Sequence, residues 1–257
     1  NGGDTRMTSP LSIPDSHDRG VSDLLAFTLT FSIIITGIAL VTLGGLGAFD
    51  AIQQGATTDV AETSMIGFAE TTDDHIQGDA PRRTTSMKLQ GHGLSIRSST
   101  LNVTVDGRST NISTGAFIRE TDSETDIVYT SGAVYRVQQE GLVVSRKPSF
   151  RCTPDSSSAY LSVLSLDGQT DFSSSSRVTI ETAVQNKTLV SPQAGKPPSA
   201  TTVLINVSET AYPDAWHRLF EQELPNWSGH SEPHTYQCTG ISRAVVHNTT
   251  VDIRTVT

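Results

Sequence analysis

The chain has 257 residues and a formal net charge of −9 at pH 7, with 27 acidic residues against 18 Lys and Arg. This balance argues against a nucleic-acid partner, because binding to phosphate backbones relies on clustered Lys and Arg. Only four of the basic residues are Lys. An acidic, Lys-poor surface is typical of salt-adapted organisms, although an ordinary acidic protein has the same balance.

A long apolar segment follows a short polar leader. Between Leu24 and Phe49 no charged residue occurs in 26 positions, and a helix of that length spans about 39 Å, more than the ~30 Å hydrocarbon core of a bilayer. A buried core helix usually has a polar face, and a cleavable secretory signal has an apolar region of only about 7 to 15 residues. The segment therefore predicts a permanent transmembrane anchor.

The charges beside this segment predict its orientation. Arg6 and Arg19 precede it, and no Lys or Arg follows until Arg82, whereas several Asp and Glu residues lie in between. Lys and Arg near a membrane span stay on the cytoplasmic side. We therefore expect residues 1–20 to be a cytoplasmic leader and the chain after about residue 50 to lie outside the cell.

The segment from Phe49 to Ala80 lacks β-rich runs and carries scattered apolar residues on a polar background. It predicts that the helix continues outward, with Gly55 as a candidate break, until Gly78 and Pro81 end it. Residues 21–80 would then form one transmembrane and stalk helix.

Short alternating runs rich in Val, Ile, Thr and Tyr begin near Thr84 and continue to the end of the chain. About ten such runs predict an antiparallel sandwich or rolled sheet, with tight turns at Asp106-Gly107 and Asp167-Gly168. The predicted fold class is α+β: the long N-terminal helix and then a mainly antiparallel, β-sandwich-like extracellular domain at residues 81–257.

One short helix is expected within the β-rich region, in TAYPDAWHRLFEQELPNW. Pro213 suits a helix start, and apolar residues recur at spacings of three and four, which predicts an amphipathic helix packed on a sheet. A membrane-surface or ligand-binding role is the alternative for Trp216 and Phe220. The apolar residues are Tyr212, Trp216, Leu219, Phe220 and Leu224.

Six of the seven asparagines lie in N-x-S/T sequons, far more than the Ser and Thr content would give by chance. All six follow the predicted anchor, on the side expected to be outside, so the sequons and the charge pattern support the same topology. Ser/Thr-rich turns alone would account for one or two of them. The predicted glycosylation sites are Asn102, Asn111, Asn186, Asn206, Asn226 and Asn248.

The two cysteines, Cys152 and Cys238, both fall in the predicted outer region. Pairs in an oxidising compartment tend to form disulfides, so we expect a Cys152–Cys238 bond. A catalytic thiol would need a nearby base, and two cysteines are too few for a cysteine-based zinc site.

Signs of an active site are weak. HSEPH places His230 and His234 around Glu232, but Pro233 breaks the helix that a metalloprotease motif requires, and a polar loop is expected instead. Acidic residues in ETDSETD predict a charged turn rather than a cation site. These are Asp122, Glu124 and Asp126. We expect no enzyme activity, no metal and no cofactor.

The segment RGVSDLLAFTLTFSIIITGIALV resembles the N-terminal anchor of haloarchaeal membrane and pilin-like proteins. The segments GDAPRRTTSMKL, DIVYTSGAVYRV, GLVVSRKPSFRC and AYLSVLSLDG resemble a haloarchaeal family of single-pass surface proteins whose function is not established. The pilin-like resemblance implies leader cleavage between Gly20 and Val21. Cleavage there would put Asp23 at the third mature position, whereas bacterial pilins usually have an acid at the fifth.

These observations lead to three hypotheses. The first is a non-enzymatic, pilin-like, glycosylated surface protein that is anchored in the lipid bilayer and contacts copies of itself or other surface proteins. The second is a solitary anchored envelope or binding module that does not assemble. A surface hydrolase is the third and would depend on His230 or His234.

Overall fold

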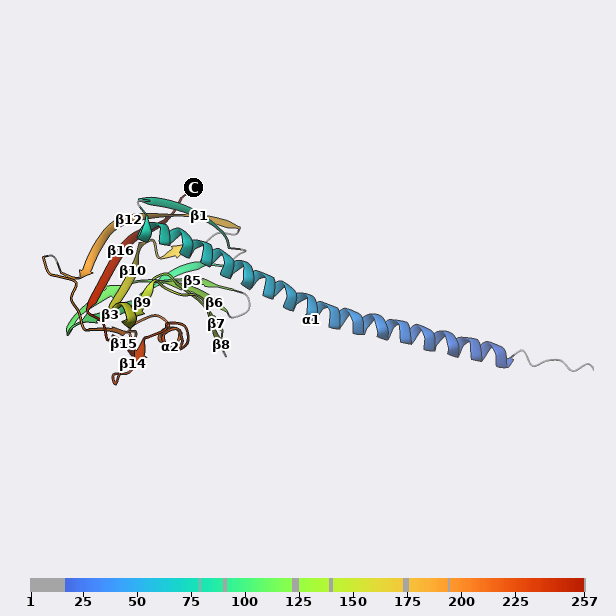
Figure 1. Cartoon of the computed structure of the whole chain (residues 1–257). Helices are drawn as coiled ribbons and strands as arrows, with labels where there is room; N and C mark the ends of the chain where they lie inside the picture. The colour runs from blue at the N-terminus through green and yellow to red at the C-terminus, as the bar shows by residue number, and fades with distance from the viewer. Residues whose placement is uncertain are drawn as a thin grey trace, which may run out of the picture. The chain divides into compact units, whose positions relative to one another are not determined.

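A computed structural model describes residues 17–256, apart from residues 79, 90–91, 122–124, 139–140, 173–175 and 194. The chain divides into two compact units between Gln53 and Gln54. The helix α1 (His17–Gln77) is continuous through Gly55 and ends where Gly78 was expected to end it (Figure 1).

The segment Ser22–Gly44 of α1 is long and apolar enough to cross a membrane, with a mean hydropathy of 2.4. Its side chains are all exposed in the structure, including large ones such as Phe27 and Ile35. A helix that is apolar on every side needs an apolar environment. The segment is therefore a candidate membrane span, as predicted.

Residues 54–77 of α1 belong to the second unit and pack into its core. Met65 and Phe68 are fully buried. The ring of Phe68 lies 4.9 Å from that of Phe117 and 5.1 Å from that of Tyr129. This part of the helix is therefore part of the β-rich unit.

Ion pairs flank this apolar contact. Arg136 contacts Glu62 at 3.1 Å, and Arg146 contacts Asp73 with both side chains largely buried. Because these pairs are partly shielded from water, they stabilise the docked helix more than fully exposed pairs would.

His75 fixes the end of α1. It is fully buried, and its two ring nitrogens contact the Ala80 carbonyl and the Thr182 hydroxyl, each at 2.8 Å. Burial lowers the pKa of His75 below its usual value, which favours the neutral form of the ring.

Sixteen strands are assigned in the described residues, and they form three sheets. Sheet A has the order β1-β12-β16-β10-β9, and its β10 and β16 run parallel whereas its other pairs are antiparallel. The strands of sheet A are β1 (Arg82–Lys88), β9 (Phe150–Thr153), β10 (Ser158–Gly168), β12 (Arg177–Ser191) and β16 (Arg243–Thr255), with the 3-10 turn Pro154–Ser156 after β9.

Sheets B and C are antiparallel, with the orders β11-β2-β5-β6-β7-β8 and β14-β15-β13-β3-β4. Sheet B contains β2 (Leu94–Arg97), β5 (Ala116–Glu120), β6 (Asp126–Thr130), β7 (Ala133–Gln138), β8 (Gly141–Arg146) and β11 (Asp171–Phe172). Sheet C contains β3 (Thr100–Val105), β4 (Arg108–Ser113), β13 (Thr202–Asn206), β14 (Ser228–Gly229) and β15 (Thr235–Thr239).

The turn predictions had different outcomes. Asp106 and Gly107 connect β3 to β4 with φ values of 45° and 79°, the left-handed conformation that a two-residue hairpin needs. Asp167 and Gly168 end β10 instead, where Gly168 has a φ of 104°.

Two hydrophobic clusters form the core, and sheet B contributes to both. Phe117 and Tyr129 of sheet B join the cluster beneath α1, whereas Ile118 and Tyr135 join the second cluster. Adjacent residues alternate between clusters because side chains of a strand point to opposite faces in turn. The central strands β5 and β6 of sheet B are therefore buried on both faces.

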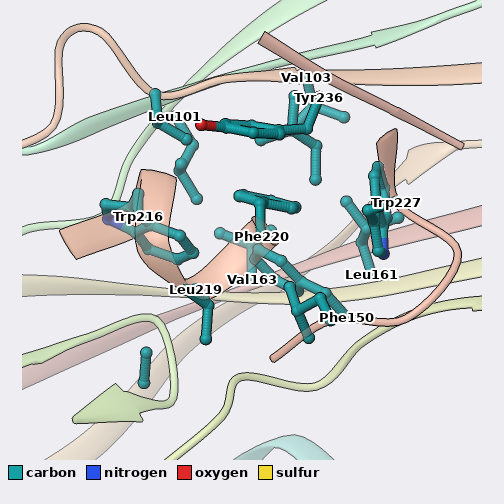
Figure 2. Packing of buried hydrophobic residues seen from close by; sticks show 14 of the residues in the cluster. Leu101, Val103, Phe150, Leu161, Val163, Trp216, Leu219, Phe220, Trp227 and Tyr236 are labelled. Carbon is teal, nitrogen blue, oxygen red and sulfur yellow. The ribbon is translucent and has the colours of Figure 1, made fainter. Parts of the chain in front are cut away.

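The second cluster contains α2 (Pro213–Gln222), the predicted amphipathic helix. Figure 2 shows Trp216 and Phe220 among side chains from sheets A and C, and they are 0% and 1% exposed. Phe220 stacks on Tyr236 at 4.3 Å. The packing prediction is confirmed, and the alternative of a membrane-surface role for these two rings is wrong.

Cys152 of β9 and Cys238 of β15 form a disulfide with a Cα–Cα distance of 5.8 Å. The bond joins sheet A to sheet C beside the second cluster. The predicted pairing is confirmed.

Candidate glycosylation surface

Three sequon asparagines lie in one register row across sheet C. Asn206 at the end of β13 pairs with Asn102 of β3, and Asn102 pairs with Asn111 of β4. Leu101 and Val103 enter the core, so Asn102 between them points to the opposite, outer face. Neighbouring strands lie about 4.8 Å apart, so the three amides form a continuous polar row.

Side-chain hydrogen bonds run along this row. Asn102 Nδ2 donates to Asn111 Oδ1 at 2.5 Å, and Asn206 Nδ2 donates to Thr235 Oγ1 at 2.8 Å. Asn206 Oδ1 accepts from the backbone N–H and the hydroxyl of Ser208, the hydroxyl residue of its own sequon, at 3.0 and 2.6 Å. All three asparagines line a shallow hollow of about 390 Å³.

Two further sequons face each other across β12 and β16 of sheet A. Asn186 pairs with Thr250, and Asn248 pairs with Thr188, so each asparagine lies opposite the hydroxyl residue of the other sequon. Asn186 Nδ2 donates to Thr188 Oγ1 at 3.0 Å, and Ser165 Oγ donates to Asn248 Oδ1 at 3.0 Å. The register thus brings the two sequons into one polar group.

A second hollow, of about 440 Å³, joins the two groups. It is lined by Asn111 from sheet C and by Asn248, Thr188 and Thr250 from sheet A. The edge strand β4 therefore brings the end of the asparagine row beside the sheet A group. Five of the six sequons share one continuous surface, which we call the sequon surface; its asparagines are Asn102, Asn111, Asn186, Asn206 and Asn248.

Asn226 lies apart from this surface, in the loop between α2 and β14. Its backbone has a φ of 66°, and its Nδ2 donates to the Cys152 carbonyl at 3.0 Å. All six sequon asparagines are exposed or half-buried. Modification at any of them is therefore compatible with burial of the core, although five lie in strands rather than in the surface loops that sequons usually mark.

The model of DUF7289, a family of unknown function, matches residues 19–257. The chain belongs to this family. No curated protein and no solved structure matches this DUF7289 member.

The structure places His230 and His234 in a loop and not on a helix. His230 and His234 lie in the predicted polar loop, where His230 Nδ1 accepts from the Glu232 backbone N–H at 3.2 Å. His217 Nδ1 shares a hydrogen bond with the hydroxyl of Tyr236, whose pKa is raised to about 12 by burial. Within the described residues, no three His, Cys, Asp or Glu side chains gather in a way that could hold a metal ion.

Two other predicted sites fall partly outside the described residues. In ETDSETD, Asp122 and Glu124 lie outside them, and Asp126 accepts a hydrogen bond from the Tyr212 hydroxyl at 2.7 Å. Most of the expected leader, residues 1–16, also lies outside. The backbone of Gly20 and Val21, where cleavage is predicted, is in the first turns of α1.

The six sequons can be recognised in the sequence, but their convergence on one surface cannot. Strand register brings Asn102 beside Asn206 across 104 positions of sequence, and no local pattern encodes that pairing. One part of this convergence follows from a local pattern. A two-residue turn at Asp106-Gly107 sets the register of the hairpin so that Asn102 lies opposite Asn111.

Proposed function

We propose that this DUF7289 member is a non-enzymatic, membrane-anchored and glycosylated cell-surface protein. In this proposal α1 holds it in the lipid bilayer, the N-terminus is cytoplasmic, and the β-rich unit lies outside the cell. The unit is sandwich-like and presents the sequon surface to the medium.

The observation that carries this proposal is the grouping of sequons on one accessible surface of a unit that follows a candidate membrane span. The outer location of that unit is supported by Arg6 and Arg19 before the span and by the lack of Lys or Arg from there to Arg82. A polar, sugar-bearing face facing water is also consistent with the hydrogen-bonding amides and hydroxyls that line both hollows.

A pilin-like role, as a filament or adhesion subunit, is supported by the two parts of α1. Residues 22–44 present apolar side chains on every side, a surface that copies of the helix can bury among themselves. Gly37 and Gly44 would permit close helix contacts. Residues 54–77 instead dock on the β-rich unit through Met65 and Phe68. The resemblance to haloarchaeal pilin-like anchors favours the same architecture.

A solitary envelope or binding module is the alternative, and it has the same anchor and the same sequons. The filament subunit and the solitary module differ in processing and assembly, because the leader of a filament subunit must be cleaved off before its helix can bundle with other copies. Mature chains that begin at Val21 and sediment with sheared filaments would support the filament subunit. Chains that keep the leader and stay in the membrane fraction would support the solitary module.

The cellular location is tested by protease treatment of intact cells. The proposal predicts that fragments from residues 81–257 are released without lysis, while peptides from residues 1–20 are cut only after the membrane is opened. Protection of the β-rich unit in intact cells would contradict the proposed orientation.

A further inference from the structure

The six sequons divide into two classes by their place in the sheets. Asn102, Asn206 and Asn248 each lie in a strand with a partner on both sides, in β3, β13 and β16. All three are half-buried. We call these the interior sequons.

The other three lie at the periphery of the sheets, and all are exposed. Asn111 is in β4, the edge strand of sheet C. In β12, only Arg177–Ala183 pair with β1, so Asn186 pairs with β16 alone. Asn226 is in a loop. We call these the peripheral sequons.

Two of the interior sequons, those of Asn102 and Asn206, are held in place by buried apolar neighbours as well as by their strand pairing. Leu101 and Val103, on either side of Asn102, are 0% and 1% exposed, and Ile205 and Val207, on either side of Asn206, are both 0% exposed. Moving these asparagines out of the sheet would pull core side chains into water. Gln185 and Lys187, on either side of Asn186, are exposed. Asn111 and Asn226 each adjoin a buried core residue, Ile112 and Trp227, so these two differ from the interior sequons by lying in an edge strand and in a loop.

N-glycosylation is a group transfer from a lipid phosphate-linked saccharide. The asparagine Nδ2 forms a bond to the anomeric carbon, the bond from that carbon to the phosphate oxygen breaks, the lipid phosphate leaves with the electron pair, and Nδ2 loses one proton. The sequon extends from the asparagine to the hydroxyl residue two positions later. We expect the transferase to bind this segment as an extended chain that has left its strand partners. Central strands open only at a free energy close to that of global unfolding, whereas edges and loops open far more easily.

We propose that the interior sequons accept a saccharide only before sheets A and C form, whereas the peripheral sequons accept one before or after folding. This inference rests on the proposed function, because it assumes that the sequons are glycosylated. It places saccharide transfer ahead of strand pairing at Asn102, Asn206 and Asn248. The sugar at these sites is then carried into the folded unit on the sequon surface.

The test uses the full chain, produced without glycans in a host that lacks the pathway and purified in detergent. One sample stays folded, and a second is denatured and reduced. Each is incubated with a single-subunit oligosaccharyltransferase and a lipid-linked oligosaccharide, and site occupancy is followed over time by peptide mass spectrometry. The folded chain should be modified at the peripheral sequons, with the interior sequons slower by about 10³-fold or more, the scale set by the unfolded fraction.

Two variants act as matched controls, because each removes the acceptor hydroxyl of one sequon. Thr104→Ala abolishes the interior sequon of Asn102, and Ser113→Ala abolishes the peripheral sequon of Asn111. Each should lose modification at its own asparagine alone in the denatured sample. Equal rates at interior and peripheral sequons in the folded chain would overturn the inference and leave the glycoprotein proposal intact. A denatured chain that accepts no saccharide at any of the six would overturn both.

Discussion

Replacing Phe68 by Ala tests whether the last part of α1 is integral to the β-rich unit. Phe68 is fully buried, and its ring lies about 5 Å from those of Phe117 and Tyr129. Removing such a side chain from a core costs about 3–5 kcal/mol, and two lost aromatic contacts favour the upper half of that range. For a unit of this size, about 4 kcal/mol corresponds to a fall in Tm of roughly 8–16 °C.

The assay is thermal and guanidinium unfolding of the detergent-solubilised chain, followed by near-UV circular dichroism. Val60→Ala in the same helix is the matched control, because Val60 is 41% exposed, and we expect it to change stability by no more than about 0.5 kcal/mol. Equal stabilities for the two variants would refute the docking of residues 54–77. They would favour a stalk that does not pack against the β-rich unit.

Three further perturbations have defined outcomes. Replacing both Cys152 and Cys238 by Ser should lower the free energy of unfolding by about 4–5 kcal/mol, since the bond closes a loop with a sequence separation of 86; an unchanged guanidinium midpoint would argue against the bond. Burial lowers the pKa of His75 in the folded chain, so as the pH drops below 6.5 the unfolded chain binds a proton at His75 more readily than the folded chain does. The free energy of unfolding should therefore stay constant above about pH 7 and fall as the pH drops below 6.5. A His75→Gln variant with the same pH slope would contradict this assignment. Asp73→Ala should cost about 1–3 kcal/mol by leaving the largely buried Arg146 guanidinium without its carboxylate, and the loss should shrink in Asp73→Asn, which keeps a side-chain acceptor.

The elements that follow from local patterns could be predicted from the sequence. The candidate span and the end of α1 near Gly78 follow from apolar length and from glycine, and α2 follows from the spacing of Trp216 and Phe220. The Cys152–Cys238 bond followed from there being only two cysteines in one predicted compartment.

The packing of residues 54–77 against sheet B was harder to predict from the sequence. Their apolar residues are few and separated by polar ones, which predicted a helical stalk that continues outward from the membrane. The structure instead buries Ala61, Met65, Phe68 and Ala69 on one side, and the contact becomes visible only when Phe117 and Tyr129 of sheet B are placed opposite. Such a surface is specified by long-range strand pairing, which no local window contains. The sequon surface escaped prediction for the same reason.

Glycopeptide mass spectrometry of the protein from its native membrane tests the central proposal most directly. We expect saccharide masses on peptides that contain asparagines of the sequon surface, with Asn111 and Asn186 among the occupied sites. All six asparagines without saccharide, in protein taken from the membrane, would contradict a glycosylated cell-surface protein.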